Sequence, residues 1–422
     1  MQHQGLWPSR WPAEDGGPRR RQAPAGGGGL ALRGGTLHAT SRMAMACTMV
    51  VLRDPGEAYL LCHTAGEDAV SWVEQIHPDT LETVRRSPDL PGGPTWPGGL
   101  ACHADGSLHV VFGNHTHRLD SGLELLATTE LPRHRPYNSF VTLPDGHLVT
   151  KDFGGVRPGQ VSPTGPDDTE LLVLHPATLD VVASATVPEP SIARLSADGD
   201  TVVVVGTTRL WQLTWNPATR ELAASTQPAP RYVTMAGQTY GWDAVLDGGA
   251  AWFLDNGEGS HRYAGTFRGQ GVNEAPLHLV RVDLADGSVE TAEICGLGGG
   301  LIANPPAVDC ARRIAVGYDS GNGVVTAFHL DEHLRLGAPA WQRPLNHAAH
   351  PLRFADTGEL LLLHHDPEAG GESAVVLDIT TGDELGRVAT GSPIQSVVFT
   401  SPGFGRDAYV CSFTTLTRVW VG

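Results

Sequence analysis

Short apolar strands alternate with tight turns along most of the chain, and one two-strand pattern recurs. In each copy, a strand of alternating apolar residues reaches a turn that usually contains Asp-Gly or Gly, and a second apolar strand follows. Asp-Gly between such strands is a strong local signal for a β-hairpin, because the turn needs a positive φ at its centre. The eight copies begin near residues 50, 100, 140, 193, 244, 307, 352 and 397.

The spacing of these hairpins predicts the architecture. A second hairpin of different composition lies between successive copies, so each period supplies four strands. The turn residues recur about every 50 residues, which is a propeller-blade period; they are Gly56, Gly106, Gly146, Gly199, Gly248, Arg312, Gly358 and Gly403. We therefore predict an all-β fold, a β-propeller of about eight four-stranded blades. Seven blades are the alternative, because the sixth copy lacks Gly at its turn.

The two ends of the chain suggest how the ring closes. The last copy ends without its outermost strand, and residues 30–39 could supply that strand and remove the exposed edge. We assign residues 43–422 to the propeller. Residues 1–42 are rich in Gly, Pro and Arg and are expected to form a disordered tail, or an over-long start with Met43 or Met45 as the true initiator.

Composition limits the partners. The chain has 46 Asp and Glu against 29 Lys and Arg, a net charge of −17, so this acidic protein is not expected to bind nucleic acid or an anionic membrane. No apolar run reaches the ~20 residues of a membrane-spanning helix. The six cysteines have no paired spacing and no secretory signal is evident, so we expect a cytoplasmic protein. The oligomeric state is left open.

Polar residues mark a candidate site at one mouth of the channel. The first strand of each blade starts on the face where the second strand ends, and that face usually carries the site of a propeller. From the first strands we expect Asn138, Tyr240, Asn304, His350 and Gln395 there, and from the second strands His63, Asp152, Asp255, Asp319, His364 and His365. Two long loops, 154–169 and 257–276, approach the same face.

These side chains suggest a metal. Carboxylate and amide oxygens around one axis suit Ca²⁺, and the histidines also fit Zn²⁺ or Fe²⁺. We expect the metal ligands to be Asn138, Asp152, Asn304 and Asp319, and assign ligand-binding roles to His63, Tyr240, Asp255, His364, His365 and Gln395. The alternative is an ordinary water-filled mouth, in which each Asp caps a tight loop.

Two stretches resemble a known family. Residues 304–309 with 314–331, and residues 137–146, are similar to blades of the gluconolactonase, regucalcin and strictosidine-synthase-like propellers. The resemblance implies an axial divalent cation, usually Ca²⁺, held by Asn138, Asn304 and Asp319, with Asp319 near the reacting group. That superfamily typically has six blades. Residues 377–382 resemble the repeat of quinoprotein-type eight-bladed propellers, without a Trp-docking repeat.

Three functions follow as hypotheses. The first is a metal-assisted hydrolase of a small lactone or ester, in which the cation polarises the carbonyl and Asp319 or His350 acts as the catalytic base. The second is a non-catalytic propeller that binds a protein, peptide or glycan. The third is a quinone-dependent oxidoreductase. A mouth filled by apolar side chains, or exposed aromatic residues around it, would favour the second.

Overall fold

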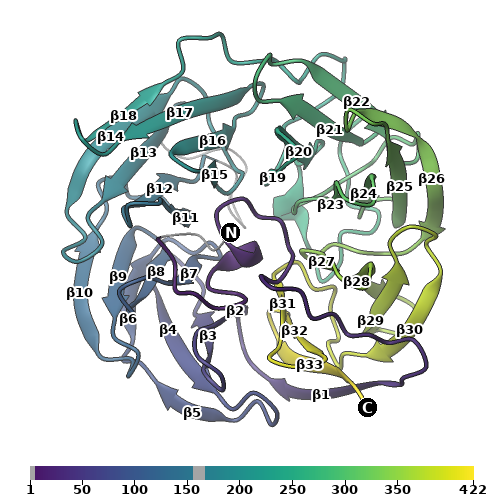
Figure 1. Ribbon diagram of the computed structural model, residues 1–422, viewed down its shortest axis with the longest axis horizontal. Coiled ribbons are helices and arrows are strands. Elements are labelled where there is room, and N and C mark those ends of the chain that lie inside the picture. Colours follow the sequence, from purple (N-terminus) through teal and green to yellow (C-terminus); the bar gives the residue numbers. More distant parts are fainter. Residues whose placement is uncertain (1–4, 155–166) are drawn as a thin grey trace.

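Eight β-sheets surround a central axis in the computed structural model, which describes residues 5–154 and 167–422 (Figure 1). This confirms the predicted propeller and its eight blades. The described residues contain only two short 3₁₀ helices, η1 (Glu14–Gly16) and η2 (Ser260–Arg262). Residues 155–166, most of the first predicted long loop, lie outside the described residues.

The first four blades follow the chain, each from the inner strand outward. Blade 1 contains β2 (Cys47–Leu52), β3 (Ala58–His63), β4 (Ala69–Ile76) and β5 (Thr83–Arg86), with β6 (Leu90–Gly93) also paired to β4. Blade 2 contains β7 (Gly99–Cys102), β8 (Leu108–Phe112), β9 (His115–Leu119) and β10 (Leu125–Glu130). Blade 3 contains β11 (Tyr137–Thr142), β12 (Leu148–Asp152), β13 (Thr169–Leu174) and β14 (Val181–Val187). Blade 4 contains β15 (Ser196–Asp198), β16 (Thr201–Val205), β17 (Leu210–Asn216) and β18 (Glu221–Ala224).

The remaining blades repeat this order. Blade 5 contains β19 (Val245–Asp247), β20 (Ala250–Leu254), β21 (His278–Asp283) and β22 (Val289–Glu293). Blade 6 contains β23 (Ala307–Asp309), β24 (Ile314–Asp319), β25 (Val324–Leu330) and β26 (Leu336–Pro344). Blade 7 contains β27 (Leu352–Phe354), β28 (Glu359–Asp366), β29 (Gly371–Asp378) and β30 (Glu384–Ala389). Blade 8 contains β31 (Thr400–Pro402), β32 (Asp407–Cys411), β33 (Thr415–Val421) and β1 (Leu37–Met43).

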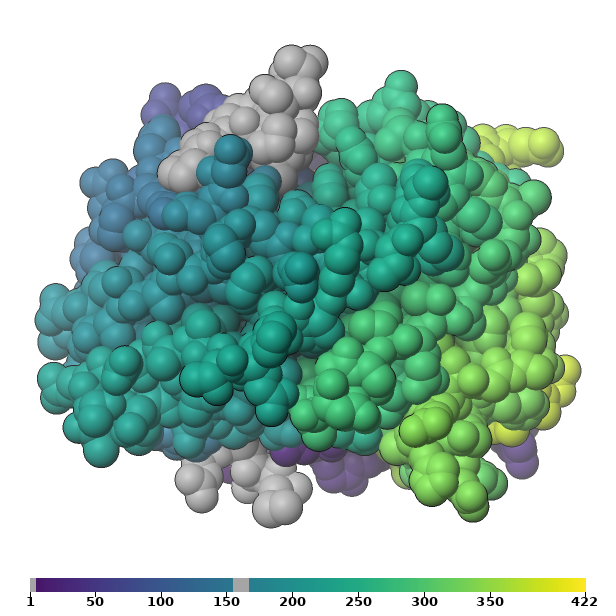
Figure 2. All heavy atoms as spheres, turned by 90° about the horizontal axis from the view of Figure 1, so that it is seen from above, coloured from purple at the N-terminus to yellow at the C-terminus, as the bar shows by residue number. Residues whose placement is uncertain are grey.

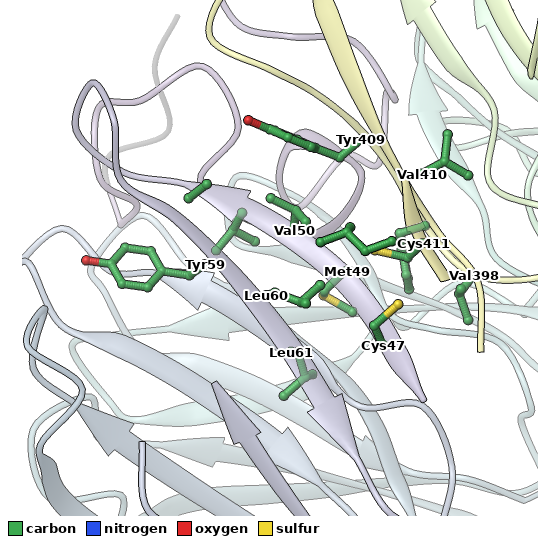
Figure 3. Close-up of a cluster of buried hydrophobic side chains, with 14 of the residues drawn as sticks. Cys47, Met49, Val50, Tyr59, Leu60, Leu61, Val398, Tyr409, Val410 and Cys411 are labelled. Atoms are coloured by element: carbon green, nitrogen blue, oxygen red, sulfur yellow. The ribbon is translucent and has the colours of Figure 1, made fainter. Parts of the chain in front are cut away.

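An N-terminal strand closes the ring, as predicted. Strand β1 pairs antiparallel with β33 from Leu37 opposite Val421 to Met43 opposite Thr415, so the closing strand lies seven residues beyond the expected start at residue 30. Between the last and first blades, side chains from β2, β3 and β32 form a continuous apolar layer (Figure 3). Cys47 and Cys411 are buried in this layer, and burial raises the pKa of the Cys411 thiol well above its usual value.

The sixth hairpin is a full member of the repeat despite its missing glycine. Strands β23 and β24 pair through Asp309 and Ile314, and Arg313 in their turn has a φ of 55°. This left-handed conformation is one that glycine adopts more easily. Arg313 adopts this conformation without being glycine, so the sixth copy forms a blade like the others and the ring has eight blades.

The two faces of the disc differ in the connections they carry. We call the face with the turns between first and second strands the hairpin face. The opposite face carries the loops that lead into first strands and leave second strands, and we call it the loop face. The predicted channel-mouth residues belong to the loop face.

Residues 5–36 depart from the expected disordered tail. They run into the centre of the ring, where η1 lies close to the axis (Figure 1). Trp11 is 1% exposed, and Glu14, Asp15 and Arg20 are also buried. The segment is ordered because Trp11 packs in the core and its charged side chains find partners of opposite charge in the channel. The Gly and Pro content of the segment gives no sign of these contacts. We call residues 5–32 the plug.

Candidate functional site at the propeller axis

The plug hydrogen-bonds to the inner strands of five blades. In a propeller the inner edge of each first strand faces the channel, and its N–H groups need partners. Here carbonyl groups of the plug accept hydrogen bonds from these N–H groups. The bonds are Leu52 N–H to Trp11 O at 2.8 Å, Cys102 to Pro12 at 2.7 Å, Ala197 to Pro18 at 2.8 Å, Leu246 to Arg19 at 2.8 Å, and Arg353 to Gln22 at 2.7 Å. The plug thus closes the channel at its hairpin end.

Charge complementarity fixes the plug to the hairpin face. Arg19 forms an ion pair with Asp198, and Arg21 Nη2 lies 2.7 Å from Asp247 Oδ1. Both aspartates end inner strands, at the hairpin turns. Further along, the N–H groups of residues 28 and 29 donate to Asp356 at 3.0 and 3.2 Å. The plug therefore contacts acidic residues at three hairpin turns, and in Figure 2 the dark purple atoms of the N-terminal region lie at the lower edge of the disc.

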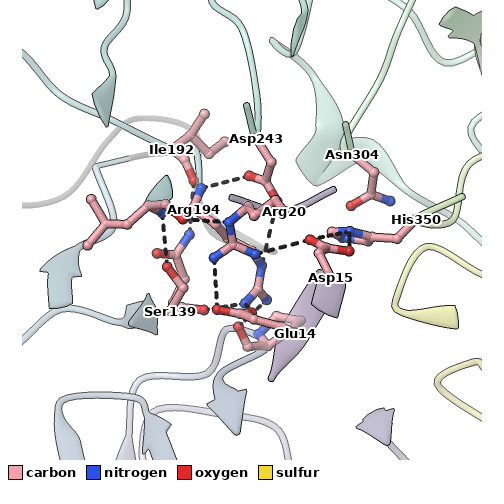
Figure 4. Close-up of polar contacts among 12 residues, drawn as sticks. Glu14, Asp15, Arg20, Ser139, Ile192, Arg194, Asp243, Asn304 and His350 are labelled. Atoms are coloured by element: carbon pink, nitrogen blue, oxygen red, sulfur yellow. Dashed lines mark hydrogen bonds and ion pairs between the residues drawn. The ribbon is translucent and has the colours of Figure 1, made fainter. Parts of the chain in front are cut away.

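A buried ionic cluster occupies the axis (Figure 4). The Arg20 guanidinium donates to Glu14 Oε1 at 2.8 Å and to Asp15 Oδ2 at 3.1 Å. From the propeller, Arg194 Nη1 donates to Glu14 Oε2 at 2.6 Å, and His350 Nδ1 lies 2.9 Å from Asp15 Oδ1. The plug thus supplies two carboxylates and one guanidinium, and the propeller supplies Arg194 and His350.

Asp243 completes the cluster. Its Oδ1 accepts the Arg194 backbone N–H at 2.7 Å, while its Oδ2 is buried without a hydrogen-bond partner among the described residues. Ligand atoms of Asp15, Asp243 and His350 lie within 4.8 Å of one another, which is a geometry able to hold a metal ion. However, the guanidinium groups of Arg20 and Arg194 already offset much of the carboxylate charge that would attract a cation.

The pKa shifts follow from this pairing. Burial alone would raise the pKa of Asp15, but the His350 imidazole and the Arg20 guanidinium outweigh it and hold that pKa below its usual value. Burial alone would lower the pKa of Arg20, and the carboxylates around it raise it instead. Both groups are therefore ionised at neutral pH, as required for a buried charge that is stable only when paired.

The plug backbone is strained where it meets the cluster. Asp15, Arg20 and Gln22 have φ values of 53°, 50° and 53°, in the left-handed region that non-glycine residues rarely adopt. Such conformations persist only where surrounding contacts hold them. The ion pairs and the inner-strand hydrogen bonds provide those contacts.

Three of the residues predicted for the site lie around this cluster. His350 contacts Asp15 directly, and its ring stacks on Phe399 with centroids 3.9 Å apart. Asn304 lies beside His350 in Figure 4, and its Nδ2 donates to Val397 O at 3.0 Å. Asn138 accepts a bond from Arg194 at its carbonyl oxygen, and its Nδ2 donates to Ile192 O at 2.9 Å.

The two predicted aspartate ligands have other partners. Asp152 Oδ2 lies 3.0 Å from both Arg133 Nη1 and Arg135 Nη1, and its Oδ1 accepts the Glu170 N–H at 2.9 Å. Asp319 accepts the N–H groups of Leu301 at 3.2 Å and Asn322 at 3.0 Å, and Asn322 Nδ2 donates to it at 2.8 Å. Asp319 thus holds the tight turn between β24 and β25, whereas Asp152 links the start of β13 to the segment that leads into β11. The structure does not bring them into one ligand set with Asn138 and Asn304.

The remaining predicted residues are spread over the loop face. Asp255 binds His278 Nδ1 at 2.9 Å and Gln238 Nε2 at 2.8 Å; burial raises its pKa, although these hydrogen bonds oppose the shift. Gln395 Nε2 donates to Asn346 Oδ1 at 3.0 Å.

The histidine candidates and Tyr240 are also buried or half-buried. His63 Nδ1 lies 2.7 Å from Thr64 O, and burial lowers the His63 pKa. His364 Nδ1 accepts the Asn346 N–H at 3.0 Å, and both ring nitrogens of His365 are buried without a partner in the described part of the chain. Burial raises the pKa of Tyr240. These side chains therefore support separate loops.

Aromatic rings cover the loop end of the channel. Trp96 stacks on Phe153 with centroids 4.2 Å apart and lies 6.2 Å from Trp242. The loop 257–276 reaches the segment that leads into blade 8, where Tyr263 OH donates to Gln395 O at 2.5 Å and the Phe267 N–H donates to Gln395 Oε1 at 2.7 Å. Phe153, Trp242 and Phe267 are buried at this end of the channel, and Trp96 and Tyr263 are half-buried.

Sequence reasoning missed the charged residues of the plug, Glu14, Asp15 and Arg20, and their partners Arg194 and Asp243. Two features of the tail could have indicated them. It carries Trp7 and Trp11, and it has acidic residues shortly before its arginine run. Buried aromatic residues and paired charges are unusual in a segment that stays disordered.

Comparison with known proteins identifies the fold alone. No family model and no curated protein matches the sequence. BamB from Moraxella catarrhalis is 12% identical with a TM-score of 0.56, over 90% of this chain and all of that one. The computationally designed Ika8 protein is 11% identical with a TM-score of 0.56, over 89% of this chain and 96% of that one. Quinohemoprotein alcohol dehydrogenase from Comamonas testosteroni is 11% identical with a TM-score of 0.58, over 97% of this chain and 80% of that one.

These likenesses place the chain among β-propellers. At such low identity they say nothing about a shared activity or cofactor. No helix in the described ranges is both long and apolar enough to cross a membrane.

Proposed function

We propose that this protein is a non-catalytic propeller that binds a polypeptide partner through its loop face. The observation that carries the proposal is the distribution of exposed apolar side chains. Of nine large apolar side chains exposed in the described part of the chain, five lie on the loop face: Met43, Met45, Met235, Val272 and Leu297. We call these five residues the loop-face patch. The other four, Val84, Leu125, Leu126 and Val181, lie in the outer strands β5, β10 and β14, and Met43 is the last residue of the outer strand β1, at the loop-face end.

Contacts between loops join the patch to the aromatic rings at the loop end. The N–H groups of Ala44 and Ala46 donate to Thr414 O at 3.0 Å and Phe413 O at 2.7 Å, so the two methionines lie against the β32–β33 loop. The Phe413 ring lies 6.4 Å from that of Tyr263, which belongs to the same loop as Val272. Val272 and Leu297 belong to loops joined by the Gly299 N–H to Asn273 O bond at 2.8 Å.

The chemistry of this surface favours a polypeptide. Met43 and Met45 are 80% and 65% exposed, and methionine side chains adapt to varied apolar partners. The apolar residues come from several connections on the loop face, an arrangement suited to a broad contact with a peptide or protein.

The axial geometry supports this function better than the hydrolase or the oxidoreductase. A metal-assisted hydrolase needs an open position beside a Lewis acid and a free carboxylate or imidazole as base. The His350 imidazole instead pairs with Asp15 of the plug, and Asp319 holds a loop. At the axis, the group able to hold an ion, Asp15, Asp243 and His350, lies beside the guanidinium groups of Arg20 and Arg194.

Peptide selection tests the proposal. The full chain is immobilised, peptides are enriched from a random display library, and dissociation constants are measured by calorimetry. The double variant Met43→Ser/Met45→Ser should bind the selected peptides at least about tenfold more weakly, because a central apolar contact contributes more than 1 kcal/mol.

A matched double variant on the outer strands, Val84→Ser/Val181→Ser, should bind as the wild type does. Peptides that bind all three proteins equally, or a library that yields no binder, would contradict the proposal. So would turnover of a lactone or ester panel by the dialysed protein with added Ca²⁺.

A further inference from the structure

Blade 2 holds a group of side chains with the composition of a transition-metal site. Ligand atoms of His103, Asp105 and His109 lie within 4.8 Å of one another. They belong to the β7–β8 turn and the first part of β8, on the hairpin face and away from the loop-face patch. His103 and His109 are buried, whereas Asp105 is exposed and can be reached by an ion from solution. Two imidazoles and one carboxylate are a common donor set for Zn²⁺ and Fe²⁺.

Hydrogen bonds orient both histidines. The Asp105 N–H donates to His103 Nδ1 at 3.2 Å, so the His103 proton lies on Nε2, which is 3.0 Å from Gly146 O. A carbonyl that accepts the second ring N–H is the usual support for a metal-binding histidine. His103 Nδ1 also lies 2.9 Å from Asp105 Oδ1, so the ring nitrogen and the carboxylate oxygen are close enough to share one ion.

His109 is oriented toward the same group. Ser107 Oγ donates its hydrogen to Asp105 Oδ1 at 2.6 Å, so His109 Nε2, 3.2 Å from Ser107 Oγ, donates to that oxygen and would exchange its proton for the ion. His109 Nδ1 is buried with no partner among the described residues. Tetrahedral Zn²⁺ coordination needs donor atoms about 3.4 Å apart, and His103 Nδ1 and Asp105 Oδ1 lie 2.9 Å apart.

The repeat itself shows that the fold does not need these histidines. His109 occupies the second β-pair from the turn, opposite Ala101. In the other seven blades this position holds Tyr59, Val149, Val202, Ala251, Ala315, Leu360 and Tyr409. Blade 2 alone places a titratable imidazole there.

Blade 3 makes the comparison sharper because its turn has the same hydrogen bonds. Gly106 N–H donates to His103 O at 2.9 Å, and Gly146 N–H donates to Leu143 O at 2.9 Å. Leu143 and Val149 of blade 3 thus stand where blade 2 has His103 and His109. Blade 3 forms the same turn with two apolar residues at these positions. The turn therefore does not require the two histidines of blade 2.

We propose that His103 Nδ1, Asp105 Oδ1 and His109 Nε2 bind one divalent transition-metal ion of the zinc type, with a fourth position open to solvent. Arg118 Nη2 donates to Asp105 Oδ2 at 3.0 Å and orients the carboxylate, and the ion would replace the Ser107 hydroxyl as a partner of Oδ1. The ion would lie where the plug begins, because the Ala104 N–H donates to Gly5 O at 3.1 Å.

Titration with Co²⁺ and Zn²⁺ tests the site. The full chain is freed of metal with a chelator, dialysed and titrated, with Co²⁺ followed by its visible absorption and Zn²⁺ by calorimetry. We expect one equivalent of each ion in the wild type. His109→Gln and Asp105→Asn should each bind at least about tenfold more weakly, because each loses a ligand.

Two control variants separate this site from others. His147→Gln removes the histidine of the blade 3 turn, where His147 Nδ1 and Asp145 Oδ2 form a two-donor pair at 3.0 Å, and His350→Gln alters the axial cluster. Both should retain one equivalent. Circular dichroism checks each variant, and if His109→Gln does not fold, the exposed Asp105→Asn variant decides. Absence of binding in the wild type, or loss of binding in His350→Gln, would overturn the assignment.

Discussion

The two ends of the channel are closed by different means. At the hairpin end, the chain's own plug supplies carbonyls to five inner strands and arginines to acidic turns. At the loop end, Trp96, Phe153 and Trp242 gather under loops whose methionines remain exposed. The hairpin end is thus satisfied within the molecule, whereas the loop end presents apolar surface without a partner in the described part of the chain. Because of this difference, we propose that the polypeptide partner binds at the loop face.

Removing the central cation of the plug should have the largest effect. Arg20→Met leaves the buried carboxylates of Glu14 and Asp15 short of a partner, and breaking a buried ion pair in this way costs about 3–5 kcal/mol. Urea denaturation measures the free energy of unfolding.

The neighbouring arginine is the matched control. Arg19→Ala breaks an ion pair in which both side chains are about half exposed, and should cost less than about 1 kcal/mol. Equal losses in Arg19→Ala and Arg20→Met would mean that the plug is not buried at the axis.

A carboxyl group at the loop end predicts a pH dependence. Burial raises the pKa of Glu372 from 4.5 to about 7, against the hydrogen bonds that it accepts from Ser396. Between these values the folded chain keeps the proton and the unfolded chain releases it. The contribution of Glu372 to stability therefore falls as the pH rises from about 4.5 to about 7, and stays lost above that, by about 3 kcal/mol in total.

Glu372→Gln should remove this dependence. The difference in unfolding free energy between variant and wild type should grow in favour of the variant from pH 4.5 to pH 7, as measured by urea denaturation at several pH values. A difference that stays constant across this window would show that Glu372 is ionised in the folded protein at low pH.

The exposed methionines should have the smallest effect on stability. Met43→Ser/Met45→Ser should change the free energy of unfolding by less than about 0.5 kcal/mol, because exposed side chains contribute little to the folded state. The same double variant is the one expected to lose peptide binding. A large destabilisation would mean that the methionines belong to the core, and would remove the argument for an interface.

The propeller could be predicted from the sequence because its signal repeats. Eight hairpins of similar spacing indicated the blades, and the missing outer strand of the last copy indicated closure by the N-terminal region. The exact closing strand, residues 37–43, could not be distinguished from residues 30–39 because both contain alternating apolar residues.

The candidate site was less predictable because its charges are paired across the whole chain. Asp15 and His350 are 335 residues apart, and no local pattern links them. Asp152 and Asp319 were expected at a metal because they end second strands, yet the same position suits a carboxylate that accepts backbone N–H groups, as Asp152 does from Glu170 and Asp319 from Asn322. A strand-end aspartate has the same sequence signature in either role.

Hydrogen exchange at the inner strands tests the central account most directly. Amide-resolved exchange of the full chain would report the N–H groups of Leu52, Cys102, Ala197, Leu246 and Arg353, whose acceptors are carbonyls of the plug. If the plug closes the channel, these five amides exchange as slowly as those within the strand ladders of the same blades. If they exchange as fast as amides of exposed turns, the plug does not occupy the channel, and the assignment of recognition to the loop face loses its basis.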